Sequence, residues 1–117
     1  MSITLACITF DCDDVPAVAG FWSQVLDRPL ADEPPPGDYF AALVPSAGSP
    51  GWLFLKVPEP KTAKNRCHVD LVAGDLDAEV ARLVGLGATH VADKSEWGHT
   101  WAVLQDPEGN EFCVARR

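Results

Sequence analysis

The sequence lacks the features of several large protein classes. It has no stretch near the roughly 18 consecutive apolar residues that a membrane span needs, so we expect no membrane partner. Met1 to Leu5 contains no basic segment ahead of an apolar run, which argues against a secretory signal. The four cysteines form no Cys-x-x-Cys pair, and outside a secretory context a disulfide framework is not expected. We therefore expect a cytoplasmic protein with free thiols.

Basic residues are also scarce. The 117-residue chain carries 9 Lys and Arg against 17 Asp and Glu, for a formal net charge of −8. Its densest basic stretch is Lys61 to Arg66, and this is not a continuous run. Because a phosphate backbone is held by clustered basic side chains, the sequence argues against a nucleic-acid partner. The acidic excess favours solubility and is also compatible with a small cationic substrate.

What the sequence does contain is an internal repeat. Ile3 to Phe10 is apolar and rich in β-forming residues, and Asp14 is a suitable N-cap for a helix that follows, in which Val15, Val18, Phe21, Trp22, Val25 and Leu26 recur at helical spacing and Pro29 marks the end. The same order recurs later in the chain. Cys67 to Val72 predicts a strand, and Asp75 predicts the cap of a second helix. The apolar face of that helix is Leu76, Val80, Leu83 and Val84, and Gly85 and Gly87 are expected to end it.

Each predicted helix is followed by three more predicted strands. These are Leu30–Glu33, Tyr39–Val44 and Trp52–Val57 in the first half, and Thr89–Asp93, Trp101–Gln105 and Glu111–Ala115 in the second. Pro34 to Gly37 predicts a rigid turn, and Asp106 to Asn110 predicts a hairpin turn with Pro at i+1 and Gly at i+3. We therefore predict an α+β fold of two tandem βαβββ units, residues 1–57 and 66–117 of one domain 1–117, whose sheets curve into a cup. The polar segment Pro58 to Asn65 links them.

Strand alternation predicts which side chains share a face. Val69 and Leu71 should pack on the second helix, which leaves His68 and Asp70 on the opposite face. The same reasoning packs Ile8 and Phe10 inward, and pairing symmetric about the Asp106 turn sets Val103 across from Cys113. A sheet face that collects polar groups in this way predicts a ligand pocket. Its candidate ligand-binding residues are Cys7, Thr9, His68, Asp70, Trp101, Glu111 and Cys113.

Several of these residues admit more than one interpretation. His68 and Asp70 can act as a general base with its orienting carboxylate or as polar anchors for a ligand, while Asp70 can instead fix a neighbouring strand or loop by hydrogen bonding. Trp101, which lies with Trp97 and His99 on or near a predicted strand, can form an aromatic wall, close one end of the cup or lie at a subunit interface. We expect Trp22 and Trp52 to be core residues.

The paired βαβββ units, the pair Phe21-Trp22 and the segment Asp106-Pro107-Glu108-Gly109-Asn110-Glu111-Phe112 resemble the glyoxalase / bleomycin resistance / extradiol dioxygenase (vicinal oxygen chelate) superfamily. The resemblance covers essentially the whole chain. Val57–Lys61 and Lys64–Leu71 further resemble a bacterial subgroup of glyoxalase-like domains. The superfamily includes glyoxalase I, extradiol dioxygenases, fosfomycin-modifying transferases and non-enzymatic bleomycin-binding proteins. The resemblance also implies a homodimer.

In metal-using members of that superfamily, the ligands come from the first and last strands of each unit and are usually His and Glu. The corresponding positions here are Cys7, Leu55, His68 and Cys113, of which only His68 matches the pattern. Cys7, His68 and Cys113 can form a soft three-ligand site suited to zinc or another divalent metal. Alternatively, both cysteines line a metal-free pocket in which His68 makes hydrogen bonds. We prefer the second interpretation.

The predicted function is therefore that of a glyoxalase-like domain protein that binds a small molecule on the concave face of its sheet, without a metal centre of the family's usual kind. The alternative is a metal-dependent lyase, isomerase or dioxygenase of the vicinal-oxygen-chelate type. The sequence does not decide whether the protein is an enzyme.

Overall fold

The structure is a computed structural model that describes residues 2–31 and 39–117. The chain divides into two compact units, Met1–Pro60 and Lys61–Arg117, each an α+β arrangement of one helix and one sheet. The turn predicted at Pro34 to Gly37 lies outside the described residues, as does the end of the strand predicted at Leu30–Glu33. No helix in the described ranges is long and apolar enough to cross a membrane.

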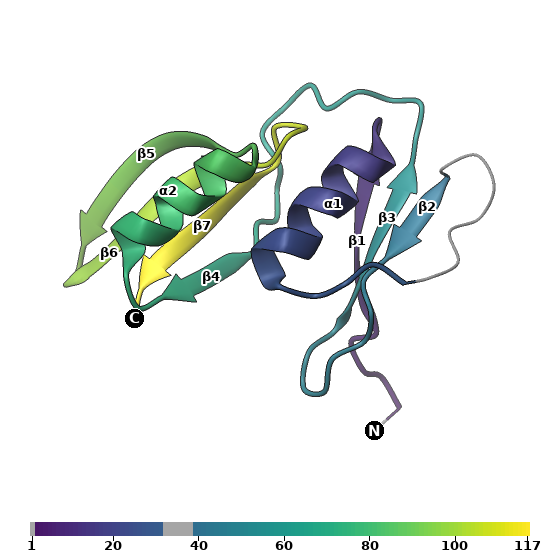
Figure 1. The fold of residues 1–117 in the computed structure, drawn as a ribbon, viewed down its shortest axis with the longest axis horizontal. Coiled ribbons are helices and arrows are strands. Elements are labelled where there is room, and N and C mark those ends of the chain that lie inside the picture. Colours follow the sequence, from purple (N-terminus) through teal and green to yellow (C-terminus); the bar gives the residue numbers. More distant parts are fainter. Residues whose placement is uncertain (1, 32–38) are drawn as a thin grey trace. The chain divides into compact units, whose positions relative to one another are not determined.

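The first unit contains a three-stranded sheet and one helix (Figure 1). Its elements are β1 (Cys7–Cys12), α1 (Val15–Leu26), β2 (Phe40–Ala42) and β3 (Gly51–Lys56). β3 lies in the centre, pairing in parallel with β1 and antiparallel with β2. Beyond β2, an isolated bridge joins Leu30 to Leu43.

The second unit contains a four-stranded sheet covered on one face by its helix (Figure 1). Its elements are β4 (Asp70–Ala73), α2 (Leu76–Leu86), β5 (Thr89–Glu96), β6 (His99–Gln105) and β7 (Glu111–Arg116). The strand order is β4-β7-β6-β5, with β4 parallel to β7 and the other pairs antiparallel. In both units, therefore, the first strand pairs in parallel with the last strand.

The two cores are built from the helix faces that the spacing predicts. Trp22 of α1 is fully buried, and its ring centroid lies 5.5 Å from that of Phe10 and 5.3 Å from that of Trp52. In the second unit, Leu83 of α2 is buried with Leu104 and Phe112 of the sheet. Because buried aromatic and branched side chains each contribute roughly 1.5–3 kcal/mol, these clusters supply most of the stabilisation of each unit.

Both helices begin at the predicted aspartates. The side chain of Asp14 accepts a hydrogen bond of 3.1 Å from the backbone N–H of Ala17, and Asp75 accepts one of the same length from Ala78. Each bond satisfies a donor that the first turn leaves without a partner. α2 ends at Gly87, whose backbone N–H bonds to carbonyl groups of the last turn. Its φ of +122° favours a residue without a Cβ.

Several predicted boundaries were wrong. β1 starts at Cys7 rather than Ile3, and β4 at Asp70 rather than Cys67, because the residues before them find no neighbouring strand to pair with over their full length. Ile3 is 88% exposed. Gly85 lies inside α2 and does not end it. Val84, expected on the apolar face of that helix, is exposed.

Substitution of Asp14 by Ala should lower the free energy of unfolding by about 1 kcal/mol, because it removes the N-cap of α1. Chemical denaturation followed by tryptophan fluorescence measures this, since Trp22 and Trp52 report on the same core. Asp14→Asn is the matched control, because an asparagine oxygen also accepts the Ala17 hydrogen bond. A loss as large in Asp14→Asn as in Asp14→Ala would contradict the capping role.

Candidate ligand-binding site

A pocket of about 450 Å³ lies on the face of the second unit's sheet that points away from α2. It is formed by β4, β6, β7 and the segment just before β4. The five candidate ligand-binding residues of this unit meet here, together with Val103, which alternation also places on this face, and with two residues that it did not single out. The lining residues are His68, Asp70, Trp101, Glu111 and Cys113, with Lys64, Val103 and Ala115.

The hairpin register explains why these side chains share a face. Val103 pairs with Cys113 and Trp101 with Ala115, as symmetric pairing about the turn predicts. β7 in turn pairs with β4, which sets Asp70 beside Cys113. Val103, Cys113 and Asp70 thus form one row across three strands, while the alternating residues Leu104, Phe112 and Val114 are buried beneath the helix.

Cys7 and Thr9 lie in the first unit, whereas every residue that lines this pocket belongs to the second. Both are exposed on the face of β1 that points away from α1, as alternation predicts. Across the sheet, Thr9 pairs with Leu53 and Asp11 with Leu55. Leu55, which stands at one of the four positions equivalent to metal ligands, is 40% exposed and offers no donor atom.

The polar floor of the pocket is a connected group of three side chains. His68 Nδ1 lies 3.0 Å from Asp70 Oδ1. Because an ionised carboxylate only accepts hydrogen bonds, the proton of the imidazole lies on Nδ1 and leaves Nε2 as the second polar atom of His68. The Cys113 thiol completes the group, with its sulfur and the donor atoms of the other two all within 4.8 Å of one another.

The thiol of Cys113 is held in its protonated form. Partial burial raises the pKa of Cys113, and the negative charge of Asp70 and the hydrogen bond between the two side chains raise it further. Lys64 acts in the opposite direction but more weakly. The environment therefore favours a neutral thiol that hydrogen-bonds to Asp70 over a reactive thiolate.

The donor set of this group bears on metal binding. One nitrogen, one oxygen and one sulfur that all lie within 4.8 Å of one another suit zinc in number and type. The set differs from the expected Cys7, His68 and Cys113, because Asp70 takes the place of Cys7 within the second unit. In the described residues these three could hold a metal ion, which would supply a Lewis acid at the pocket floor.

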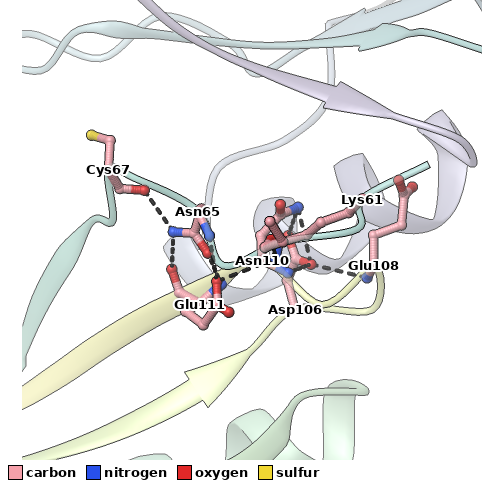
Figure 2. Close-up of polar contacts among 8 residues, drawn as sticks. Lys61, Asn65, Cys67, Asp106, Glu108, Asn110 and Glu111 are labelled. Atoms are coloured by element: carbon pink, nitrogen blue, oxygen red, sulfur yellow. Dashed lines mark hydrogen bonds and ion pairs between the residues drawn. The ribbon is translucent and has the colours of Figure 1, made fainter. Parts of the chain in front are cut away.

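Glu111 is engaged in a network that ties the segment before β4 to the start of β7 (Figure 2). The Asn65 side chain accepts a hydrogen bond of 2.8 Å from the Glu111 N–H and donates one of 3.1 Å to the Glu111 carbonyl oxygen. The same amide donates to the Cys67 carbonyl oxygen at 2.6 Å. Asn65 thus extends the pairing of β4 with β7 through its side chain.

The carboxylate of Glu111 is also bound. It accepts a hydrogen bond of 3.2 Å from the Asn65 N–H and lies 3.6 Å from the Lys61 ammonium. Burial acts to raise the pKa of Glu111, but hydrogen bonds from its own and the Asn65 backbone, with the charges of Lys61 and Lys64, lower it overall. The carboxylate therefore stabilises the fold above its ordinary pKa of 4.5, and this contribution is lost as the pH falls through the lowered value.

The turn that follows β6 fixes the other end of this network (Figure 2). Asp106 is 3% exposed, and its carboxylate accepts hydrogen bonds from the backbone N–H groups of Glu108 and Asn110 and from the Asn110 side chain. The Gly109 N–H donates to the Asp106 carbonyl oxygen, which closes the predicted turn. A buried aspartate with all these partners holds β6 and β7 in the register that forms the pocket.

Sequence reasoning missed Lys64 and Asn65 as site residues. Both lie in a stretch with no strand or helix periodicity, which was expected to be only a polar linker. The available signal was chemical, since an asparagine shortly before a strand can hydrogen-bond to neighbouring backbone. Its partner Glu111 is 46 residues away, and local patterns do not reveal such a contact.

Substitution of Asn65 by Ala should lower the free energy of unfolding by about 1–2 kcal/mol, because the Glu111 N–H and two carbonyl groups lose their partner. Thermal or chemical unfolding measures the loss. Hydrogen exchange should also quicken at the amide of Glu111. The matched control is Lys64→Ala at the adjacent exposed position, which should leave both readouts nearly unchanged, and an equal loss there would refute the role of Asn65.

Alkylation by iodoacetamide near neutral pH should be slower at Cys113 than at the exposed Cys67, because burial and Asp70 keep the Cys113 thiol protonated. Asp70→Asn removes the negative charge and should speed the reaction at Cys113. Peptide mass spectrometry measures both rates in one sample, with Cys67 as the internal reference. An unchanged Cys113 rate in Asp70→Asn would show that Asp70 does not control the thiol.

Comparison with known proteins agrees with the resemblance in the sequence. Among the solved structures that match, three at low identity illustrate the shared fold. An enzyme of the glyoxalase/bleomycin resistance protein/dioxygenase family from Burkholderia phytofirmans PsJN has 20% identity and a TM-score of 0.78, with 97% of this chain and 98% of that chain covered. TnmS3, an antibiotic binding protein from Streptomyces sp. CB03234, has 21% identity and a TM-score of 0.72, covering 99% and 98%. The fosfomycin resistance protein FosX from Mesorhizobium loti has 13% identity and a TM-score of 0.73, covering 100% and 93%.

No curated protein shows significant similarity to this sequence. A family model does, and it spans nearly the whole chain, including both first strands and the hairpin that forms the pocket. The match runs from residue 7 to residue 115, and on this evidence the chain belongs to the family of glyoxalase-like domains.

Proposed function

We propose that this protein binds a small molecule in the pocket of its second unit, without the help of a metal ion. The observation that carries the proposal is the pocket itself, a hollow of about 450 Å³ that combines an apolar wall with a cluster of polar groups. Ligand sites typically have this composition, in which apolar surface gives affinity and a few polar atoms give orientation. The similarity of the fold to an antibiotic binding protein agrees with such a role.

The pocket favours a ligand with a flat apolar part. Trp101, Val103 and Ala115 form the apolar wall on β6 and β7, and the Trp101 ring offers a large rigid surface for stacking. At the floor, His68 and Asp70 provide hydrogen-bonding atoms to a ligand. Glu111 contributes less directly, because its carboxylate is already bound to Lys61 and the Asn65 N–H.

A second candidate function is a metal-dependent lyase, isomerase or dioxygenase. It is favoured by the three donor atoms of His68, Asp70 and Cys113, which lie close enough together to hold zinc or another divalent cation. Cys7, also expected as a ligand from the sequence, lies in the first unit. The homodimer and the cytoplasmic location expected from the sequence stay predictions.

Flat aromatic fragments should bind this protein, and Trp101→Ala should weaken their binding about tenfold through the loss of the apolar wall. Titrations followed by protein-observed NMR measure the affinity and show whether the Trp101 indole N–H responds. Trp97→Ala is the matched control, because Trp97 is 85% exposed at the turn between β5 and β6, outside the pocket. Binding that is lost equally in both variants, or that leaves the Trp101 signal unmoved, would refute the pocket assignment.

The same titrations separate the two functions when they are run on chelator-treated protein and on protein with added zinc. Equal affinities, with no zinc retained after dialysis, support the metal-free function. Stoichiometric zinc that is lost in His68→Ala and that is required for fragment binding supports the metal-dependent one. Manganese, nickel and iron serve as further metals in the comparison.

A further inference from the structure

A second hollow adjoins the ligand pocket. It measures about 470 Å³ and is lined by Ala63, Lys64, Asn65, Arg66 and His68. Lys64 and His68 line both hollows, so the two hollows are neighbours at these side chains. The second hollow differs in chemistry, because Lys64 and Arg66 are its charged residues and both are basic.

These basic side chains contrast with the charge of the whole chain. The formal net charge is −8, yet Lys61, Lys64 and Arg66 fall within six consecutive positions. Lys61 is paired with Glu111, at 3.6 Å. Lys64 and Arg66 make no ion pair with any of the residues that the structure describes (2–31 and 39–117), so their charges are available to a ligand.

The acidic residues nearby already have polar partners. Asp70 accepts the Nδ1 hydrogen of His68 at 3.0 Å and interacts with the Cys113 thiol. Glu111 interacts with Lys61 and with the Asn65 N–H. The positive charge of Lys64 also acts on two side chains of β7, because it acts to lower the pKa of Glu111 and of Cys113. Lys64 and Arg66 are therefore the charged side chains at the second hollow that have no ion pair among the described residues.

We propose that the ligand of this protein carries an anionic oxygen group, a carboxylate or a phosphate, which Lys64 and Arg66 bind while its flat apolar part lies against Trp101. The Arg66 guanidinium can contact two such oxygens at once, and Lys64 supplies a point charge. His68, which lines both hollows, offers a further polar contact. This inference rests on the proposed small-molecule binding function. It favours an anionic ligand over the small cationic substrate with which the net charge of the chain is compatible.

The test compares three probes that share one ring system but differ in charge. These are 2-naphthoate, the neutral 2-naphthamide and the cationic 2-naphthylmethylammonium, with 2-naphthyl phosphate added to distinguish carboxylate from phosphate. Calorimetric titration of the full chain should show the naphthoate or the phosphate binding about tenfold more tightly than the amide, which corresponds to ~1.4 kcal/mol. The difference should shrink as salt rises from about 0.01 M to 1 M, because the Debye length falls from about 30 Å to about 3 Å.

Variants show whether these particular side chains are responsible. Lys64→Gln/Arg66→Gln should remove the preference, so that the naphthoate and the phosphate bind no more tightly than the amide does to the same variant. The double variant Lys94→Gln/Arg117→Gln removes the same charge from exposed positions outside both hollows and should keep the preference. A preference that is lost equally in both double variants would overturn the proposal, because it would then reflect net charge alone.

The outcomes also separate this inference from the proposed function. If the amide binds as tightly as the anions, or the ammonium binds most tightly, the anionic ligand is refuted while small-molecule binding in the pocket stands. If none of these probes binds but other aromatic fragments still shift the Trp101 signal, the anionic ligand is again refuted alone. Failure of every fragment and every probe refutes both.

Discussion

The candidate site depends on the parallel pairing of β4 with β7. That pairing sets Asp70 beside Cys113, and it directs the preceding segment, with Lys64 and His68, along the same sheet face. β4 has only four residues, which is short for a strand that must hold a site. Asn65 compensates for this shortness, because its side chain continues the hydrogen bonding to Glu111 where the backbone ladder stops. The Asn65 side chain thus completes the hydrogen bonding of β4, the edge strand on which the site is built.

The chemistry of this site depends more on hydrogen bonds and ion pairs between neighbouring groups than on the net charge of the chain. Asp70 is bound to His68, Glu111 to Lys61 and Asn65, and Asp106 to the backbone of its own turn. Polar groups on a partly buried surface need such partners, since an unpaired one costs about 1–3 kcal/mol. Each acidic side chain in and around the pocket therefore has polar partners, whereas Lys64 and Arg66 have no ion pair among the described residues. The anionic ligand proposed above rests on this difference.

The features predicted correctly from the sequence are those governed by local chemistry. Asp14 and Asp75 act within one helical turn, and the Asp106 turn fixes the register of β6 and β7 by itself. Alternation then places every side chain of those strands on a known face. His68 and Cys113 could accordingly be assigned to one face from strand alternation and the turn alone.

The features that were missed depend on partners far away in the chain. Ile3 and Leu5 have the apolar character of a strand, but they are exposed because β3 pairs only from Gly51 onwards. Lys64 and Asn65 carry no periodic signal at all. The turn between β5 and β6 was missed for a different reason. Trp97 and Gly98 have φ values of +51° and +77°, and a tryptophan is an unusual residue for the first position of such a turn.

The contact that gathers the three possible metal ligands also works against their use as ligands. Zinc binds the thiolate of cysteine, so Cys113 would have to lose its proton first. Burial and the neighbouring Asp70 charge raise the pKa of Cys113 and make that loss harder. Asp70, for its part, already accepts the Nδ1 hydrogen of His68. A metal bound to Cys113 and Asp70 would compete with these bonds, whereas an organic ligand that contacts the group from the pocket leaves them in place. This is the reason why we propose that the three side chains act as a preorganised hydrogen-bonding floor and not as metal ligands.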